Sequence, residues 1–171
     1  MRTIKSYVKR KGRITEGQNQ AINTLWTKYG IDYSKEFLNF PFIFNNNNPV
    51  HLEIGFGDGE SLIKQAVSNF EKNYIGIEVH DPGIGRCLMN IKKHNLTNIM
   101  ISSHDAIEVI NDQIKENTLE RINLYFPDPW PKKRHHKRRI VQPAFLDMIA
   151  NRLKEGGTLN IATDSAAYAE H

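Results

Sequence analysis

The chain has 171 residues, of which 39% are hydrophobic and 25% are charged, a composition typical of one globular domain with a substantial core. No apolar run approaches the roughly 20 residues that a membrane-spanning helix requires, so the composition argues against a membrane protein. Cys87 is the only cysteine, which excludes an internal disulfide and favours a reducing cytoplasm.

Positive charge is concentrated in two segments. Residues 1–13 contain six Lys/Arg and no acid, and residues 132–139 contain six more. The rest of the chain holds the remaining 11 Lys/Arg against all 19 Asp/Glu, so a mildly acidic domain carries two basic runs. Clustered cations indicate a polyanionic partner such as a nucleic acid, although the first run alone is equally typical of a solvated tail.

The elements are expected in two parts. Residues 1–40 predict a basic N-terminal arm with a lead-in helix, and residues 41–171 predict the main domain. After an asparagine-rich loop at 45–49, strands are expected at 50–54, 73–79, 98–102, 121–126 and 158–163. Helices are expected between them at 60–70, 82–95, 105–114 and 143–154, the last ended by Gly156 and Gly157.

This alternation predicts an α/β fold with a doubly wound, mostly parallel, Rossmann-like sheet, whose ligands bind at the C-terminal ends of the strands. The sequence ends at His171, just where another helix is expected to begin. A sheet that ends at the fifth strand leaves an open edge, so we expect the C-terminal strands of the domain to be missing.

A glycine-rich loop follows the strand at 50–54, in the stretch "LEIGFGDGESL" (52–62). Gly55, Gly57 and Gly59 allow a positive φ and expose bare backbone to a ligand. Glu53 lies inside the strand, where a carboxylate disfavours a pyrophosphate and suits a cationic, amino acid-like ligand.

Two further acids follow the next strands. Glu78 ends the second strand and is placed to accept hydrogen bonds from ribose hydroxyls. Asp105 follows the third strand, where an adenine-contacting group would lie; its alternative role is a helix cap. The recurrence of acids after successive strands favours S-adenosyl-L-methionine, which carries positive charge. A dinucleotide is the alternative, but Glu60 stands where its fingerprint needs a third glycine.

The stretch "YFPDPWPKKRHHKRR" (125–139) places a single acid beside the densest positive charge. Asp128 follows the fourth strand, and the prolines on either side of it restrict its backbone. Trp130 offers a stacking face or an apolar cover, and an ordinary proline turn is the alternative. No metal is predicted, because cations flank His135 and His136 and no acid or cysteine lies nearby.

These residues closely resemble those of the bacterial tRNA (guanine-N7)-methyltransferases, which have the class I methyltransferase fold. The matching stretches are "SYVKRKGRITEGQ" (6–18), "LEIGFGDGESL" (52–62), "GIEVHDPGIG" (76–85), "FPDPWPKKRHHKRRIVQ" (126–142) and "ATDSAAYAEH" (162–171). The resemblance implies transfer of a methyl group from S-adenosyl-L-methionine to N7 of a guanine in the tRNA variable loop. The family also has a substrate-binding segment beyond the position of His171.

The resemblance also assigns roles to residues. Asp128 would be catalytic and would contact the cofactor, together with Glu53, Gly55, Gly57, Glu78 and Asp105. Lys132 and Asp164 would bind substrate. The RNA-binding residues would be Arg134, His135, His136, Lys137, Arg138 and Arg139.

Two other functions stay open from the sequence. One is a non-catalytic RNA-binding fragment of such an enzyme, and the other is a dinucleotide-dependent oxidoreductase. The sequence is compatible with a monomer or a homodimer. We expect the arm "KSYVKRKGR" to become ordered on tRNA.

Overall fold

The computed structural model describes Tyr7 and residues 12–171, which contain one six-stranded parallel sheet. Its strand order is β1-β4-β3-β2-β5-β6. The strands are β1 (Gly30–Ile31), β2 (Val50–Ile54), β3 (Asn73–Ile77), β4 (Ile99–Ser102), β5 (Leu119–Tyr125) and β6 (Leu153–Ala162). Every neighbouring pair is parallel, as the sequence predicts.

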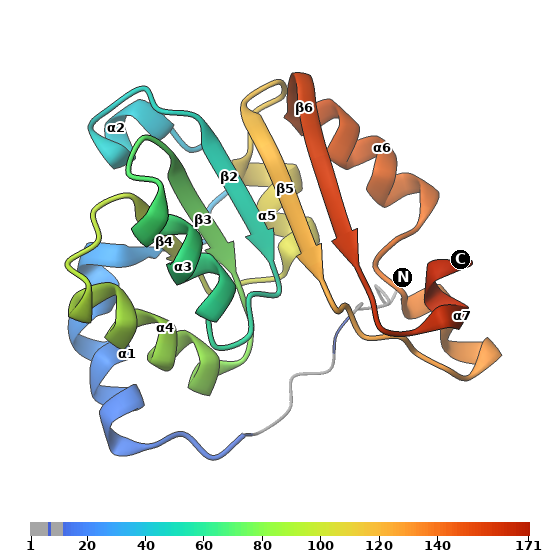
Figure 1. The fold of residues 1–171 in the computed structure, drawn as a ribbon, viewed down its shortest axis with the longest axis horizontal. Coiled ribbons are helices and arrows are strands. Elements are labelled where there is room, and N and C mark those ends of the chain that lie inside the picture. The colour runs from blue at the N-terminus through green and yellow to red at the C-terminus, as the bar shows by residue number, and fades with distance from the viewer. Residues whose placement is uncertain (1–6, 8–11) are drawn as a thin grey trace.

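Helices cover both faces of the sheet, so the prediction of a doubly wound fold is confirmed. Figure 1 shows α3 and α4 in front of the sheet and α5 behind it. The helices of the described residues are α1 (Glu16–Tyr29), α2 (Phe40–Phe44), α3 (Glu60–Ser68), α4 (Asp81–Lys93), α5 (Ala106–Gln113), α6 (Pro143–Arg152) and α7 (Ala166–Ala169), with a 3-10 helix η1 (Lys133–Arg138).

Two hydrophobic cores lie on opposite faces of the sheet. One joins the apolar sides of α1, α3 and α4 to β3 and β4, through residues such as Leu62 and Leu88. The other joins α2, α5 and α6 to β2, β3 and β5, through residues such as Leu52 and Ile122. Because side chains alternate along a strand, Tyr74 packs in the first core and Ile75 in the second.

The order of the strands reverses at β2. The chain runs from β2 outward through β3 to β4, and then returns to place β5 on the other side of β2. Loops that leave β2 and β5 therefore diverge to opposite faces, which opens a crevice at the C-terminal ends of these strands.

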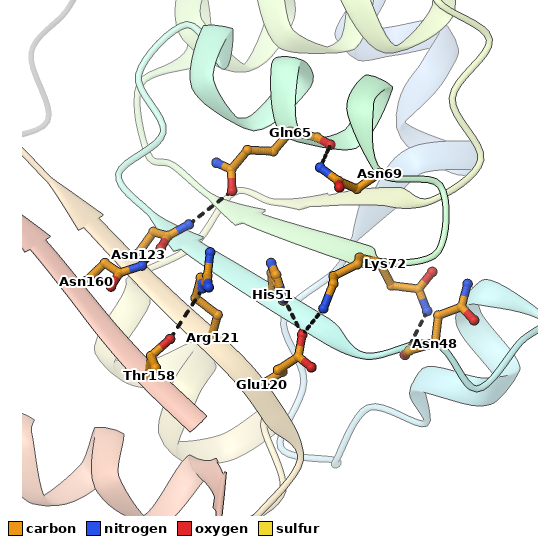
Figure 2. Close-up of polar contacts among 11 residues, drawn as sticks. Asn48, His51, Gln65, Asn69, Lys72, Glu120, Arg121, Asn123, Thr158 and Asn160 are labelled. Atoms are coloured by element: carbon orange, nitrogen blue, oxygen red, sulfur yellow. Dashed lines mark hydrogen bonds and ion pairs between the residues drawn. The ribbon is translucent and has the colours of Figure 1, made fainter. Parts of the chain in front are cut away.

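Polar side chains occupy one face of β2, β5 and β6, as Figure 2 shows. Glu53, Asn123 and Asn160 lie side by side across the three strands. Asn160 donates to Asn123 Oδ1 at 3.1 Å, and Gln65 of α3 donates to Glu53 Oε2 at 3.2 Å. In Figure 1 the near face of β5 and β6 lies clear of the helices, which accounts for its polar character.

Some predicted boundaries were wrong. The helix expected at 143–154 ends at Arg152, and β6 begins at Leu153 rather than at residue 158. Gly156, with φ of 75°, lies within β6. There the register with β5 shifts, since Leu119 pairs with Leu153 and Arg121 with Thr158. The glycines therefore form an irregularity in a strand instead of ending a helix. Sequence analysis missed β1 and α2.

Most of the predicted N-terminal arm lies outside the described residues, apart from Tyr7, Gly12 and Arg13. Within the described part of the chain, no helix combines the length and apolarity needed to span a bilayer.

A matched pair of Gly→Ala substitutions tests how α1 packs on α4. At Gly85 a Cβ would lie 2.7 Å from the backbone oxygen of Gln18, whereas at Gly17 it would meet only Met89 Cε, at 3.9 Å. Gly85→Ala should lower the free energy of unfolding by about 1–3 kcal/mol, because backbone cannot yield to the added methyl group. Gly17→Ala should leave it unchanged or raise it by up to about 1 kcal/mol through helix propensity. Urea denaturation measures both; equal effects would contradict the close approach.

Candidate functional site

A cavity of about 370 Å³ lies at the C-terminal ends of β2, β3, β4 and β5. Its lining comes from the loops that leave these four strands, and includes Gly55, Glu78, His104 and Asp128. The sequence predicts a ligand site at this edge of the sheet, and the volume is in the range of small-molecule sites.

The glycine loop (residues 55–59) leaves bare backbone beside this cavity. Gly55 and Gly57 have φ of 70° and 60°, and among the described residues no atom outside the adjacent residues lies within 4 Å of the position that a Cβ would occupy. The positive φ favours glycine at both positions, and the open space lets a ligand approach the main chain. The start of α4 packs against the same loop, since a Cβ at Gly83 would lie 2.1 Å from Gly57 O.

Glu78 is held by three backbone N–H groups. Oε2 accepts from Gly57 N at 2.8 Å, and Oε1 accepts from Val79 N at 2.7 Å and from His80 N at 3.1 Å. A carboxylate has about four acceptor positions, so Oε2 retains capacity for a ligand hydroxyl. The carboxylate that the sequence assigns to a ribose is therefore fixed in direction at the cavity wall.

Asp105, the predicted adenine-contacting residue, lies at the start of α5. Its side chain caps α5 by accepting from Ile107 N at 2.9 Å, and it is 8% exposed. Its neighbours His104 and Ala106 line the cavity, whereas Asp105 does not. The helix cap, which the sequence left as the alternative, is therefore present.

Sequence analysis missed His104. Its ring stacks on Tyr33 with centroids 3.9 Å apart and planes 12° from parallel. His104 Nε2 lies 2.6 Å from Glu108 Oε2, and Tyr33 donates its hydroxyl hydrogen to Asp112. The two carboxylates come from successive turns of α5, so this helix fixes a two-ring stack at the cavity wall. No local motif could reveal it, because Tyr33 and His104 are distant in sequence.

The Asp128 loop (residues 126–130) connects β5 to the basic segment. Asp128 is exposed and lines the cavity, as do Phe126 and Pro127. Phe126 and Trp130 have φ of 49° and 43°, a region that large side chains rarely adopt. The loop therefore has an uncommon backbone conformation at both of its ends.

The basic segment (residues 132–139) projects beside the loop as η1. Lys132, Arg134 and Lys137 are exposed, and Arg138 places its guanidinium 4.9 Å from the centroid of the Trp130 ring. His135 and His136 are half-buried. Desolvation, together with nearby cations, lowers the pKa of His135, which favours its neutral form.

Arg139 differs from the other predicted RNA-binding residues. It is 2% exposed, so the expectation that its guanidinium faces a nucleic acid is wrong for this conformation. The cause is its set of intramolecular contacts, because its Nε donates to Pro129 O at 2.9 Å and its Nη1 to Ala167 O at 3.1 Å.

Asp164 lies in the turn between β6 and α7 and is exposed, outside the lining of the cavity. The described part of the N-terminal region does reach the cavity. Tyr7 lines it, and Gly12 packs so closely on His80 that a Cβ would lie 2.5 Å from its Nε2.

Glu53 is buried behind the cavity instead of lining it. Its side chain faces α3, where Gln65 is its hydrogen-bond donor, and it is 3% exposed. Burial raises the pKa of this carboxyl from its usual 4.5 to about 7. The structure thus brings Gly55, Glu78 and Asp128 together, and separates Glu53, Asp105 and Asp164 from the cavity surface.

Comparisons with known proteins place the chain among methyltransferases. A family model described as "Putative methyltransferase" matches residues 47–171. The tRNA (guanine-N(7)-)-methyltransferase of Photobacterium profundum is 50% identical over 171 residues, which cover 100% of this chain and 70% of that protein. The protein of the same name from Vibrio cholerae serotype O1 is 49% identical over 172 residues, covering 100% and 72%.

Solved structures share the fold. An antibiotic-related methyltransferase aligns with a TM-score of 0.61 and 22% identity, covering 82% of this chain and 70% of its own. The aminoglycoside resistance methyltransferase NpmB1 aligns with a TM-score of 0.52 and 19% identity, covering 66% and 54%. The predicted class I methyltransferase fold is therefore confirmed.

Glu53→Gln should change the dependence of stability on pH. Since the folded protein retains the Glu53 proton up to about pH 7 and the unfolded chain releases it near pH 4.5, the wild type loses stability as pH rises through this window. Gln cannot ionise and can still accept from Gln65. It should therefore be more stable than the wild type at pH 8 by up to about 2–3 kcal/mol, with little difference at pH 4.

Urea denaturation between pH 4 and pH 8 measures this effect. Asp147→Asn, at an exposed position of α6, is the control. A difference between wild type and Glu53→Gln that stays constant across the pH range would contradict the raised pKa.

Proposed function

This chain belongs to the tRNA (guanine-N(7)-)-methyltransferase family, and we propose that it transfers a methyl group from S-adenosyl-L-methionine to N7 of a guanine in the tRNA variable loop. The observation that carries the proposal is the position of Asp128, on the cavity wall and directly before an exposed run of cations. A cofactor and a polyanionic substrate can meet at such a place. Family membership removes the support for a dinucleotide-dependent oxidoreductase.

The residues of the cavity fit S-adenosyl-L-methionine. Gly55 exposes bare backbone to open space, and Glu78 has a free acceptor position for a ribose hydroxyl. His104, whose ring is stacked on Tyr33, lines the cavity at the end of β4, where a base would lie beyond the ribose. When bound, this cofactor supplies an electrophilic methyl group on a sulfonium.

The chain's own contribution to the reaction is positioning and electrostatics. Guanine N7 has a free lone pair and carries no proton, so no general base is required. Methylation leaves a positive purine, and the carboxylate of Asp128 would stabilise that charge as it develops. We propose Asp164 as a second carboxylate that contacts the substrate, from the turn after β6.

We propose that the exposed cations of the basic segment bind tRNA phosphates, with Lys132 nearest to Asp128 in the chain. Each phosphate contact adds to affinity and to its salt dependence. Glu53 and Asp105 are proposed to act on the cofactor indirectly, since one is buried behind the glycine loop and the other caps α5. The single cysteine, buried and unpaired, is compatible with a cytoplasmic setting.

The function is tested by transfer of labelled methyl groups to unmodified tRNA, followed by chain cleavage specific for N7-methylguanine. We expect label in the tRNA and cleavage at one guanine of the variable loop. Binding of tRNA and S-adenosylhomocysteine without an N7 product would instead favour a non-catalytic RNA-binding protein.

Asp128→Asn separates catalysis from cofactor binding. At saturating cofactor, we expect the turnover number to fall about 10–100-fold, because an amide lacks the charge that stabilises the methylated purine. Asp147→Asn is again the control. Weaker cofactor binding with an unchanged turnover number would exclude the catalytic role and leave Asp128 with a role in cofactor orientation.

A further inference from the structure

Arg139 is a buried cation at the end of a basic segment whose other Lys and Arg side chains are exposed or half-buried. It is 2% exposed, and among the described residues no carboxylate forms an ion pair with it. Burying a charge with neutral partners has a large desolvation cost. The presence of a guanidinium in this position therefore indicates a role that an apolar side chain could not perform.

The guanidinium joins three separate pieces of chain. Nε donates to Pro129 O at 2.9 Å, and Nη1 donates to Ala167 O of α7 at 3.1 Å. Nη2 lies 3.2 Å from Nε2 of His136, in η1. The Cζ atom of the guanidinium lies over the Tyr168 ring, 4.8 Å from the ring centroid. Arginine suits this geometry because its donors are arranged in a rigid planar fork.

The first of these contacts is made with the Asp128 loop. Pro129 follows Asp128 directly, and it lies between Asp128 and Trp130, whose φ of 43° is unusual for a large side chain. Phe126, at the other end of the loop, has φ of 49°. A backbone in this region persists only where surrounding contacts hold it. The bond from Arg139 to Pro129 O is such a contact, at the residue next to the carboxylate.

Two further contacts of Arg139 connect the loop to α7, which follows β6, the neighbour of β5. Ala167 and Tyr168 belong to α7, which begins two residues after Asp164. The Tyr168 hydroxyl accepts from Val141 N at 3.2 Å, which ties α7 to the chain that follows Arg139. Arg139 is therefore bonded both to the loop with Asp128 and to α7, which follows the turn with Asp164.

We infer that Arg139 is a positioning residue: it holds the Asp128 loop and α7 together so that Asp128 faces the cavity. This inference deepens the proposed function and rests on it, since the consequence for turnover follows only if Asp128 acts on the substrate. The exposed cations of the segment can still contact phosphates. A run of Lys and Arg that looks uniform in sequence therefore contains surface residues and one buried arginine that connects other segments of the chain.

The test compares Arg139→Lys and Arg139→Gln with Lys137→Gln, an exposed neighbour in the same segment. Lysine retains the charge but cannot span two carbonyl groups. All variants carry Trp26→Phe, which leaves Trp130 as the only tryptophan, and a Trp26→Phe protein is the reference. Thermal melting is recorded first, and the other measurements are made well below the onset of unfolding.

Three quantities are measured. In both Arg139 variants, acrylamide quenching of Trp130 should increase, because the adjacent Pro129 is released. The turnover number should fall at least about tenfold, since small displacements of a catalytic group are costly. The salt dependence of tRNA affinity should stay that of the reference. Lys137→Gln should instead lower the salt slope by about one while leaving the quenching of Trp130 unchanged.

Two results would overturn the inference. A lower salt slope in the Arg139 variants with unchanged Trp130 quenching would make Arg139 an RNA contact. Full turnover in Arg139→Lys would show that charge suffices and that the fork geometry has no role. The quenching measurement needs neither cofactor nor tRNA, so it tests the positioning role of Arg139 even if the reference protein yields no N7-methylguanine. That outcome would refute the proposed function alone.

Discussion

Parallel pairing of β2 with both β3 and β5 is the constraint on which the site depends. All five residues of β2 are buried, and each is in register with a residue of both neighbouring strands. Since all three strands run the same way, their C-terminal ends meet at one edge. The glycine loop, Glu78 and the Asp128 loop then converge, although dozens of residues separate them in the chain. A one-residue shift of register at β2 would turn its side chains to the opposite face and dismantle the cavity.

Backbone N–H groups fix the carboxylate of Glu78, and this has consequences for charge. Glu78 accepts three main-chain hydrogen bonds, so no cation is needed beside it. Positive charge can therefore be placed outside, in the basic segment, where it attracts a polyanion without neutralising the acids of the cavity. Arg139 is the exception, because its partners are carbonyl groups and an aromatic ring.

Burial on the face of the sheet beside α3 changes the chemistry of the Glu53 carboxyl group. Glu53, Asn123 and Asn160 form a polar row across three strands, where Figure 2 shows the amide groups of the two asparagines directed toward one another. Gln65 donates a hydrogen bond to Glu53, whose carboxyl group is buried and has a pKa of about 7. A group that is half-protonated near neutrality interacts with a cationic ligand differently from a fixed anion. The environment of Glu53 thus depends on α3 as much as on its own strand.

The sequence by itself determined the parallel α/β sheet, four of its central strands and the position of the glycine loop, because these depend on local periodicity and on glycine's backbone freedom. It also determined that Asp128 follows a strand and precedes a basic run, which is a matter of order along the chain. Contacts between distant segments decided the rest. Tyr33 and His104 meet only because β1 and β4 pair, and the glycines at 156–157 lie in β6 because β5 is available to pair with the chain at Leu153.

Arg139 illustrates the limit of sequence-based prediction most clearly, because in the sequence it is one cation among six. Only the approach of Pro129 and Ala167 from two other segments gives its guanidinium internal partners and removes it from solvent. Sequence periodicity reports how a residue relates to its neighbours along the chain, whereas burial and hydrogen bonding depend on which distant segments pack against it, and that was decided by the tertiary structure.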